Sequence, residues 1–318
     1  MTRSRYGWAI RFVAASVVLF AAMRPSPAQL HDWRFQGRFQ AHGTHDPFSG
    51  NRSFVSRARI WADGFFLPKT STRFQYDFRT RSIWDLWVSY HPTEHLEVRM
   101  GRSWLPFVGD YTESPFFLDM IDFPAAWVLF PAREHGVFFV GDVGETAYSI
   151  NIVQGSGWQS DSNRWKDVFG HVKSPFFNDR LTLGFAHYEG RGGESGQLWT
   201  KRRVSGDFIW KVHSLLTVKG SWLAGRDGEV SSQGWWGRGL VHLSRKVDVV
   251  AEMNDFSRGT AAARYLTWGA NYYFPWGLTR LKFNHRYFFE PASVSEFKLQ
   301  LQIFLEENWR SRGRSKGR

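Results

Sequence analysis

From residue 30 onward, apolar and polar side chains alternate along the chain with a period of two residues. The alternation is strict over residues 73–79, 96–100 and 297–303, where aromatic or aliphatic residues are separated by charged or amide residues. Because successive residues of a β-strand point to opposite faces, this period predicts strands with one apolar face and one polar face.

The alternating segments are about ten residues long, which is the length of a strand that crosses a membrane. An open sheet edge cannot be satisfied in lipid, so such strands must close into a barrel. The pattern therefore predicts an all-β fold, a transmembrane antiparallel β-barrel of about sixteen strands. The sixteen expected strands lie at residues 32–42, 52–63, 70–79, 82–91, 94–103, 133–142, 145–154, 165–174, 179–189, 198–211, 214–225, 233–244, 246–256, 262–274, 277–289 and 294–306.

Connections of two kinds alternate along the chain. Residues 91–94 and 141–144 carry the Pro, Gly and Asp residues of tight turns, whereas residues 155–164 and 190–197 are longer and rich in Gly, Ser and Asp. Short turns at one end and longer loops at the other are typical of outer-membrane barrels, with the short turns in the periplasm. An even number of strands would place both termini on that side.

One connection, residues 104–132, is long and rich in aromatic residues. Long loops without regular structure are usually functional, and a solvated loop would not carry so many aromatic rings. We expect this third extracellular loop to fold into the lumen and narrow it; the alternative is a loop that packs across the barrel mouth or against a neighbouring subunit. The expected constriction residues are Trp104, Phe107, Asp110, Phe116, Phe117 and Trp127.

The two ends of the chain differ from the barrel. Residues 1–28 combine early arginines, an apolar run over 12–23 and small residues before position 28, which predicts a signal peptide cleaved after Ala28. The apolar run is shorter than the ~20 residues of a spanning helix, which disfavours the alternative of an uncleaved anchor. We expect the barrel at 29–306 and a disordered, basic periplasmic tail at 307–318.

Composition changes this picture little. Aromatic residues make up 18% of the chain although its mean hydropathy is −0.39, as expected for a barrel with an apolar belt and a wet interior. There is no Cys, so a disulfide framework is excluded. The net charge of +12 falls to +8 without the four leader arginines and to +3 without the five basic tail residues, and no nucleic-acid motif is present.

If the apolar positions face lipid, their polar neighbours face the lumen, where rings of Arg and Lys select anions. The alternative is that these cations pair with Asp77, Asp85, Glu97, Asp248 and Glu252, which would leave little net field. The expected pore-lining, anion-binding cations are Arg57, Arg59, Arg73, Arg79, Arg99, Lys219, Arg280, Lys282, Arg286 and Lys298.

Two further interpretations concern aromatic and histidine side chains. Trp61, Trp87 and Trp104 would form a slide for amphipathic solutes if they faced the lumen, whereas such residues are more often anchors at the membrane interface. His187 and His242 lie on expected strands without a Ser–His pair or a hydrolase motif. We therefore expect no enzyme activity, no cofactor and no metal site.

Three segments resemble the phosphate-selective (O/P) porins of bacterial outer membranes. Residues 101–107 (GRSWLPF) resemble that family's strand end before the long loop, 133–137 (REHGV) the restart of the barrel, and 148–155 (YSINIVQG) the next strand. The resemblance implies a sixteen-stranded barrel, a homo-trimer and passage of small anions such as phosphate. Expected partners are small anionic or polar solutes, outer-membrane lipids and the barrel-assembly machinery, but no nucleic acid.

The sequence thus predicts an outer-membrane porin, exported with a cleaved signal peptide, for passive diffusion of small hydrophilic solutes. Two alternatives remain open at this point. One is a structural or binding barrel whose lumen is plugged by residues 104–132, and the other is a membrane-embedded hydrolase assembled across strands.

Overall fold

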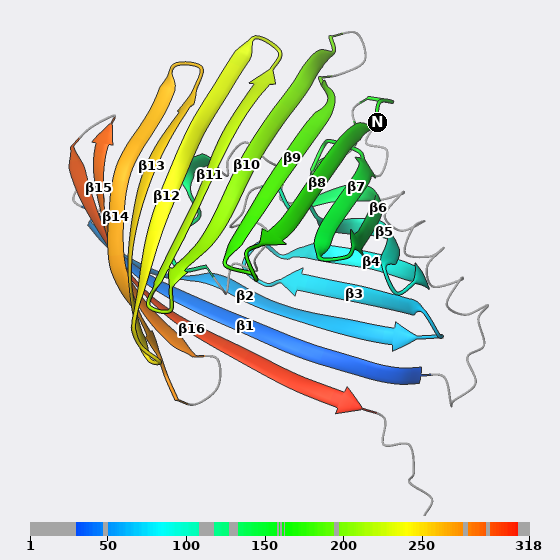
Figure 1. Cartoon of the computed structure of the whole chain (residues 1–318), viewed down its shortest axis with the longest axis horizontal. Coiled ribbons are helices and arrows are strands. Elements are labelled where there is room, and N and C mark those ends of the chain that lie inside the picture. Colours follow the sequence, from blue (N-terminus) through cyan, green and yellow to red (C-terminus); the bar gives the residue numbers. More distant parts are fainter. Residues whose placement is uncertain are drawn as a thin grey trace, which may run out of the picture.

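Sixteen antiparallel strands close into a single barrel in the computed structural model (Figure 1). It describes residues 30–46, 50–107, 118–126, 133–157, 159, 161, 163–193, 197–275, 279–290 and 293–310. Each strand pairs with its neighbours in the sequence, and β1 pairs with β16 to close the ring, for example Phe39 opposite Ile303. The predicted fold class and strand number are confirmed.

The strands follow the order of the chain. They are β1 (Leu30–Asp46), β2 (Gly50–Phe66), β3 (Thr70–Asp77), β4 (Ser82–Thr93), β5 (Leu96–Trp104), β6 (Arg133–Val143), β7 (Thr146–Val153), β8 (Asp167–Phe176), β9 (Leu181–Gly192), β10 (Trp199–His213), β11 (Leu216–Asp227), β12 (Val230–Ser244), β13 (Val247–Arg258), β14 (Ala261–Tyr273), β15 (Arg280–Glu290) and β16 (Val294–Arg310). The start of β1 lies beside the end of β16, so we call this end of the barrel the terminal end and the opposite end the loop end.

Several strands extend beyond the alternating segments. The last strand was expected to end at residue 306, but β16 continues to Arg310 because the first residues of β1 lie opposite it, Trp33 facing Trp309 and Asp32 facing Arg310. Backbone pairing does not require alternation, so the pattern misses such extensions. The predicted signal peptide, its cleavage site and residues 311–318 lie outside the described residues.

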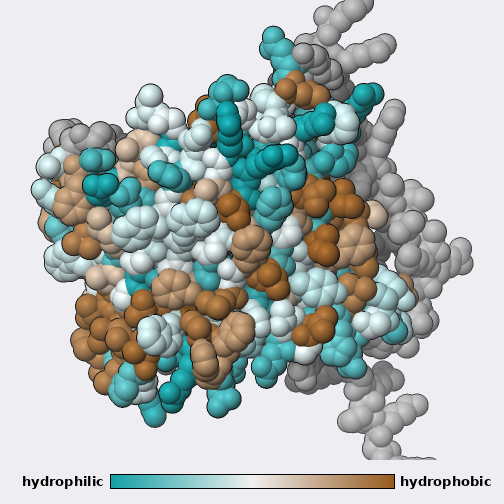
Figure 2. Space-filling model, turned by 45° about the horizontal axis from the view of Figure 1, so that its top comes forward, coloured by the Kyte–Doolittle hydropathy of each residue, from teal (hydrophilic) through white to brown (hydrophobic). Residues whose placement is uncertain are grey.

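The outer wall is apolar and the inner wall polar, the inverse of a soluble protein. Ile60, Met100 and Trp222 point outward and are each about half exposed, whereas Lys282 and Gln300 point inward and are fully buried. Figure 2 shows hydrophobic side chains over much of the outer wall, between hydrophilic ones at its edges. Among the described residues, no helix is long and apolar enough to span a membrane.

One glycine is required by the close approach of β4 and β5. Gly101 lies opposite Trp87 and has a φ of +129°, which side-chain-bearing residues rarely adopt. A Cβ atom at this position would lie 2.3 Å from the backbone oxygen of Leu86. Gly101 therefore allows β5 to turn inward at the point where it leads into the long connection.

Candidate functional site

The long connection after β5 folds into the barrel, as predicted. Leu105 and Phe107 are almost fully buried and pack with inward-facing residues of several strands, including Phe169 of β8, whose ring centroid lies 5.7 Å from that of Phe107. The Ser205 hydroxyl of β10 donates a hydrogen bond to the Phe107 carbonyl oxygen (2.5 Å). The described parts of the loop, residues 105–107 and 118–126, thus lie against the inner wall, and we call them the inner loop.

Asp119 fixes the inner loop to strands β11 and β12. Its carboxylate lies 2.9 Å from Lys219 Nζ and 3.2 Å from an Arg238 guanidinium nitrogen, two cations that are directly opposite each other in the sheet. Burial opposes ionisation of Asp119, but the charges of Arg238 and Lys219 outweigh it and hold the pKa of this carboxyl below its ordinary value. Asn271 donates a further hydrogen bond to the Asp119 carbonyl oxygen (2.9 Å).

Asp122 and the neighbouring backbone bind strands β15 and β16. The Asp122 carboxylate lies 2.6 Å from Lys298 Nζ and 3.1 Å from an Arg286 nitrogen. The buried ammonium of Lys282 donates to the Leu118 carbonyl oxygen, and the Asn284 amide oxygen accepts from the Ile121 amide (2.8 Å). Four predicted pore-lining cations, Lys219, Lys282, Arg286 and Lys298, therefore contact the inner loop, a role that the sequence did not indicate.

Four further predicted cations, Arg57, Arg59, Arg73 and Arg99, lie on the inner wall of strands β2 to β5. Arg59 pairs with Asp77, Arg73 with Asp63 (2.5 Å), and Arg99 with Glu97 (2.9 Å). The predicted alternative of pairing with Asp77 and Glu97 thus occurs. Arg57 instead donates to the Gln40 amide oxygen (2.6 Å) and lies 5.8 Å from the centre of the Phe123 ring in the inner loop.

Indole rings support the same wall. Trp61 and Trp87 are each 9% exposed and face inward, with the Arg38 guanidinium 5.1 Å from the Trp61 ring centre and the Arg99 guanidinium 4.3 Å from that of Trp87. The interpretation of these two residues as anchors at the membrane interface is therefore wrong. They share the odd-numbered positions of the inward-facing arginines, so alternation places them inside.

Trp84 is the centre of a second cation–aromatic cluster. The guanidinium carbons of Arg59 and Arg133 lie 3.3 and 4.2 Å from its ring centre, and Arg133 also pairs with Asp85 (2.7 Å). Next to these strands, Arg38 of β1 lies directly opposite Arg59 of β2. Like charges directly opposite each other in a sheet repel. Here the rings of Trp61 and Trp84 and the carboxylate of Asp77, which lie beside these two arginines, offset that repulsion.

Two predicted cations occupy other positions. Arg79 lies in the exposed turn after β3, because that strand ends at Asp77, whose carboxylate accepts a hydrogen bond from the Arg79 amide (2.9 Å). It was expected on a strand facing the lumen, which is wrong. Arg280 lies at the terminal end of β15, 4.8 Å from the ring centre of Tyr273.

The sequence missed five charged residues of the site. Arg38 and Arg238 could have been found by alternation, since both occupy inward-facing positions of strands. Asp119 and Asp122 lie in the irregular part of the inner loop, where no period marks them. Arg133 begins β6, and only the fold brings it next to Asp85.

The predicted constriction residues are only partly described. Trp104 is the last residue of β5 and half-buried, with Arg133 4.7 Å from its ring centre, and Phe107 is buried. Asp110, Phe116, Phe117 and Trp127 lie outside the described residues.

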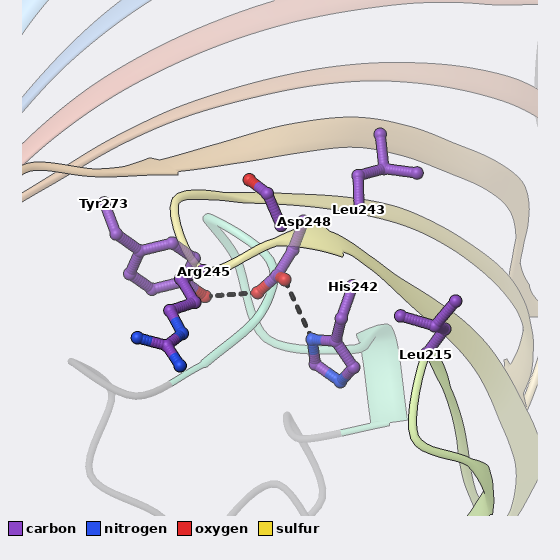
Figure 3. Close-up of a pocket in the computed structure, with 7 residues that line it drawn as sticks. Leu215, His242, Leu243, Arg245, Asp248 and Tyr273 are labelled. Carbon is purple, nitrogen blue, oxygen red and sulfur yellow. Dashed lines mark hydrogen bonds and ion pairs between the residues drawn. The ribbon is translucent and has the colours of Figure 1, made fainter.

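A cavity of about 460 Å³ lies at the terminal end between β11 and β14 (Figure 3). Within this cavity, the Asp248 carboxylate accepts one hydrogen bond from the Tyr273 hydroxyl (2.6 Å), and its other oxygen lies 2.8 Å from His242 Nδ1. His242 Nε2 lies 3.4 Å from the Thr217 hydroxyl, but Thr217 does not line the cavity. The described residues contain no group of three or more His, Asp or Glu side chains that could hold a metal.

Several solved outer-membrane proteins share this barrel fold. A loop L8 deletion mutant of OmpT, an outer membrane protein of Vibrio cholerae, has a TM-score of 0.68 at 10% identity, over 86% of this chain and 99% of that one. The anion-selective porin of Comamonas acidovorans has 0.66 at 11% identity, over 86% and 99%. The outer membrane channel DcaP of Acinetobacter baumannii has 0.67 at 9% identity, over 88% and 99%.

At 9–11% sequence identity, these similarities show a shared fold and nothing further. The sequence matches no protein-family profile and no curated protein sequence. The resemblance to the phosphate-selective porins stays a prediction, because none of these three structures is described as phosphate-selective.

Proposed function

We propose that the chain is an outer-membrane porin for passive diffusion of small hydrophilic solutes. The observation that carries this proposal is a closed sixteen-stranded wall that is apolar outside and densely charged inside, with a loop folded within it. In transmembrane barrels a polar interior of this kind either forms a water-filled channel or is plugged by a loop, and we propose the channel. The likeness in fold to a channel and an anion-selective porin supports the same conclusion.

We further propose that the pore prefers small anions, phosphate among them. On strands β1 to β6, four inward-facing arginines pair with carboxylates (Arg59 with Asp77, Arg73 with Asp63, Arg99 with Glu97 and Arg133 with Asp85), and two more, Arg38 and Arg57, contact the Trp61 ring and the Gln40 amide oxygen. Fixed cations in a narrow, low-dielectric passage raise the local anion concentration. Arg57 gives the sharpest test of this anion preference. It contacts the Gln40 amide oxygen and the Phe123 ring, and it lies beside the inner loop, where the passage is narrowed.

Planar-bilayer recordings in a salt gradient test both proposals. We expect discrete conductance steps and an anion-selective reversal potential for the refolded protein. Arg57→Gln should lower the anion-to-cation permeability ratio, whereas Arg264→Gln, a cation on the outer wall paired with Asp255, should leave it unchanged. A cation-selective wild type would refute the anion preference, and the absence of conductance would refute the pore.

A plugged barrel is the second candidate, favoured by the many contacts that hold the inner loop. The two candidates differ in one measurement, since a plugged barrel conducts only after the loop is released. If the wild type is silent and the double variant Asp119→Asn/Asp122→Asn conducts, the plugged barrel is correct. We infer no catalytic role, and labelling by a serine- or threonine-reactive fluorophosphonate would contradict this.

We also propose a homo-trimer that associates through the outer face of β1 and β2. By alternation that face carries the small residues Gly37, Ala41 and Ala62 beside the exposed apolar side chains of Phe39 and Ile60, which together allow close, apolar contact with another subunit. Exposed tryptophans, which suit the lipid interface, lie instead on β10 to β14, at Trp210, Trp222, Trp235 and Trp268. One OmpT structure of Vibrio cholerae is described as a trimer form. Light scattering in detergent tests the proposal, and Ala62→Trp should shift the mass to that of a monomer.

Export follows from the same proposal. Residues 1–28 are removed as a signal peptide, the terminal end faces the periplasm, and the barrel-assembly machinery inserts the barrel. N-terminal sequencing of protein from the outer-membrane fraction should begin at Gln29. Mobility on a gel that does not change on boiling would argue against a folded barrel.

A further inference from the structure

The rim of the terminal end is electrostatically uneven. Around the terminal ends of β8 to β13, four exposed residues are basic (Arg180, Lys211, Arg245 and Lys246) and one is acidic (Asp179). Around the terminal ends of β4 to β7, the rim instead carries Glu94, Asp142 and Glu145, together with His95, which pairs with Asp142 (2.7 Å). The positive charge at this end is therefore concentrated under one half of the wall, the half that also carries the exposed tryptophans.

The cavity of about 460 Å³ opens within this basic rim. In Figure 3, Leu215 and Leu243 lie on one side of His242, and Arg245 and Tyr273 lie on the other. Leu215 and Leu243 are 53% and 62% exposed, and Leu243 lies on the outer, apolar face by alternation. The cavity thus joins an apolar edge of the outer wall to a cationic group at the turn between β12 and β13.

Asp248 does not oppose an anion here as strongly as its charge suggests. Its two oxygens are engaged by His242 Nδ1 (2.8 Å) and the Tyr273 hydroxyl (2.6 Å), and its side chain is 8% exposed. Arg245, by contrast, is exposed at the turn. A guanidinium beside apolar side chains at a membrane interface suits a phosphate diester that carries acyl chains.

From this juxtaposition we propose that the cavity and the basic rim bind the headgroup of an anionic phospholipid. The inference rests on the proposed function in one respect, that the barrel lies in a bilayer. The phosphate pairs with Arg245 and Lys246, and the acyl chains lie along Leu215, Leu243 and the apolar wall above them. Aromatic side chains at the same level, Phe176 and Trp210, are 44% and 49% exposed, as in a membrane-interface belt.

Native mass spectrometry of the full-length mature protein, released from detergent micelles, tests the site. Phosphatidylglycerol and phosphatidylethanolamine with identical acyl chains differ in headgroup charge. Because each cation near a bilayer surface contributes about a fivefold gain in affinity for anionic lipid, wild type should bind the first lipid at least fivefold more tightly. Arg245→Ala should remove about fivefold of that affinity, and Arg245→Ala/Lys246→Ala about twenty-fivefold.

The matched control is Lys69→Ala, which removes an exposed cation from the turn between β2 and β3 at the same end. It should change the affinity less than twofold, and gel mobility before and after boiling shows that each variant is folded. Equal binding of the two lipids, or an unchanged affinity of Arg245→Ala, would overturn the proposal. So would full displacement of the lipid by equimolar glycerol phosphate, which would identify a site for free phosphate.

Conductance of the same preparations separates this inference from the proposed function. Arg245→Ala should conduct as wild type does, because Arg245 lies in the turn between β12 and β13, away from the inward-facing arginines of β1 to β6. A conducting barrel without lipid preference refutes only the lipid site, whereas a silent barrel that retains the preference refutes only the pore.

Discussion

Replacing Asp119 by asparagine should loosen the inner loop without unfolding the barrel. The carboxylate lies between Lys219 and Arg238, which are directly opposite each other on β11 and β12. Asparagine keeps the shape of the side chain but leaves the two cations facing one another. Arg238 retains Glu252 as a partner, whereas Lys219 loses the carboxylate that binds it at 2.9 Å.

The size of the effect follows from the burial of this cluster. The Asp119 side chain is 10% exposed and that of Arg238 is fully buried. Removing one partner of a buried ion pair costs about 3–5 kcal/mol, which shifts the equilibrium between docked and released loop by about a hundredfold to several thousandfold. Met120, which is almost fully buried, still contributes about 1.5–3 kcal/mol of packing. The loop should therefore be released part of the time.

Single-channel recording and limited proteolysis measure this release. We expect Asp119→Asn to show added conductance fluctuations and faster cleavage within residues 104–132, with an unchanged thermal transition of the β-sheet signal in circular dichroism. Asp255→Asn is the matched control, because it breaks an Asp–Arg pair on the outer wall that is 32% and 45% exposed. Such surface pairs contribute about 0–1 kcal/mol. Equal behaviour of the two variants would refute the conclusion that Asp119 holds the inner loop against β11 and β12.

Three further predictions follow from the geometry. Gly101→Ala should lower the free energy of unfolding by at least about 2 kcal/mol in urea titration, because a Cβ atom there would lie 2.3 Å from a backbone oxygen and φ is +129°. Gly170→Ala should change the free energy of unfolding little, because a Cβ atom there would meet no other atom within 4 Å. Equal losses in the two variants would contradict the reasoning. The lowered pKa of Asp119 means that its ion pairs with the inner wall are fully formed above the ordinary Asp pKa of about 3.9, and that they are lost as the pH falls through the lower pKa of the folded protein. Conductance should therefore be constant from about pH 5 to 8 and change only in acid. Asp119→Asn should lack this change. Glu134→Gln should speed amide hydrogen exchange at Gly155, in the connection between β7 and β8, by about tenfold or more, because the Gly155 amide donates to the Glu134 carboxylate at 3.1 Å. Unchanged exchange would show that this carboxylate does not hold the connection.

Part of the candidate site was visible in the sequence. Inward positions of Arg59, Arg73 and Arg99 follow from alternation, because the direction of a strand side chain is a local property of the backbone. The same rule failed at Trp84, where the register between β3 and β4 shifts near Asp85 and brings both side chains to the inner wall. A bulge changes the face of a residue without a sign in the period.

The sequence by itself determined the strands, their number and the two faces of the wall, since each depends on residues that are two apart. Tertiary structure alone decided what the inward charges do. Asp119 meets Lys219 and Arg238 about a hundred residues later in the chain, and four of the ten predicted pore-lining cations (Lys219, Lys282, Arg286 and Lys298) contact the inner loop. The strands are set by local backbone geometry. Ion pairs, in contrast, form between those charges that the closed barrel and its folded loop bring close together, and the alternation along the chain carries no information about which charges these are.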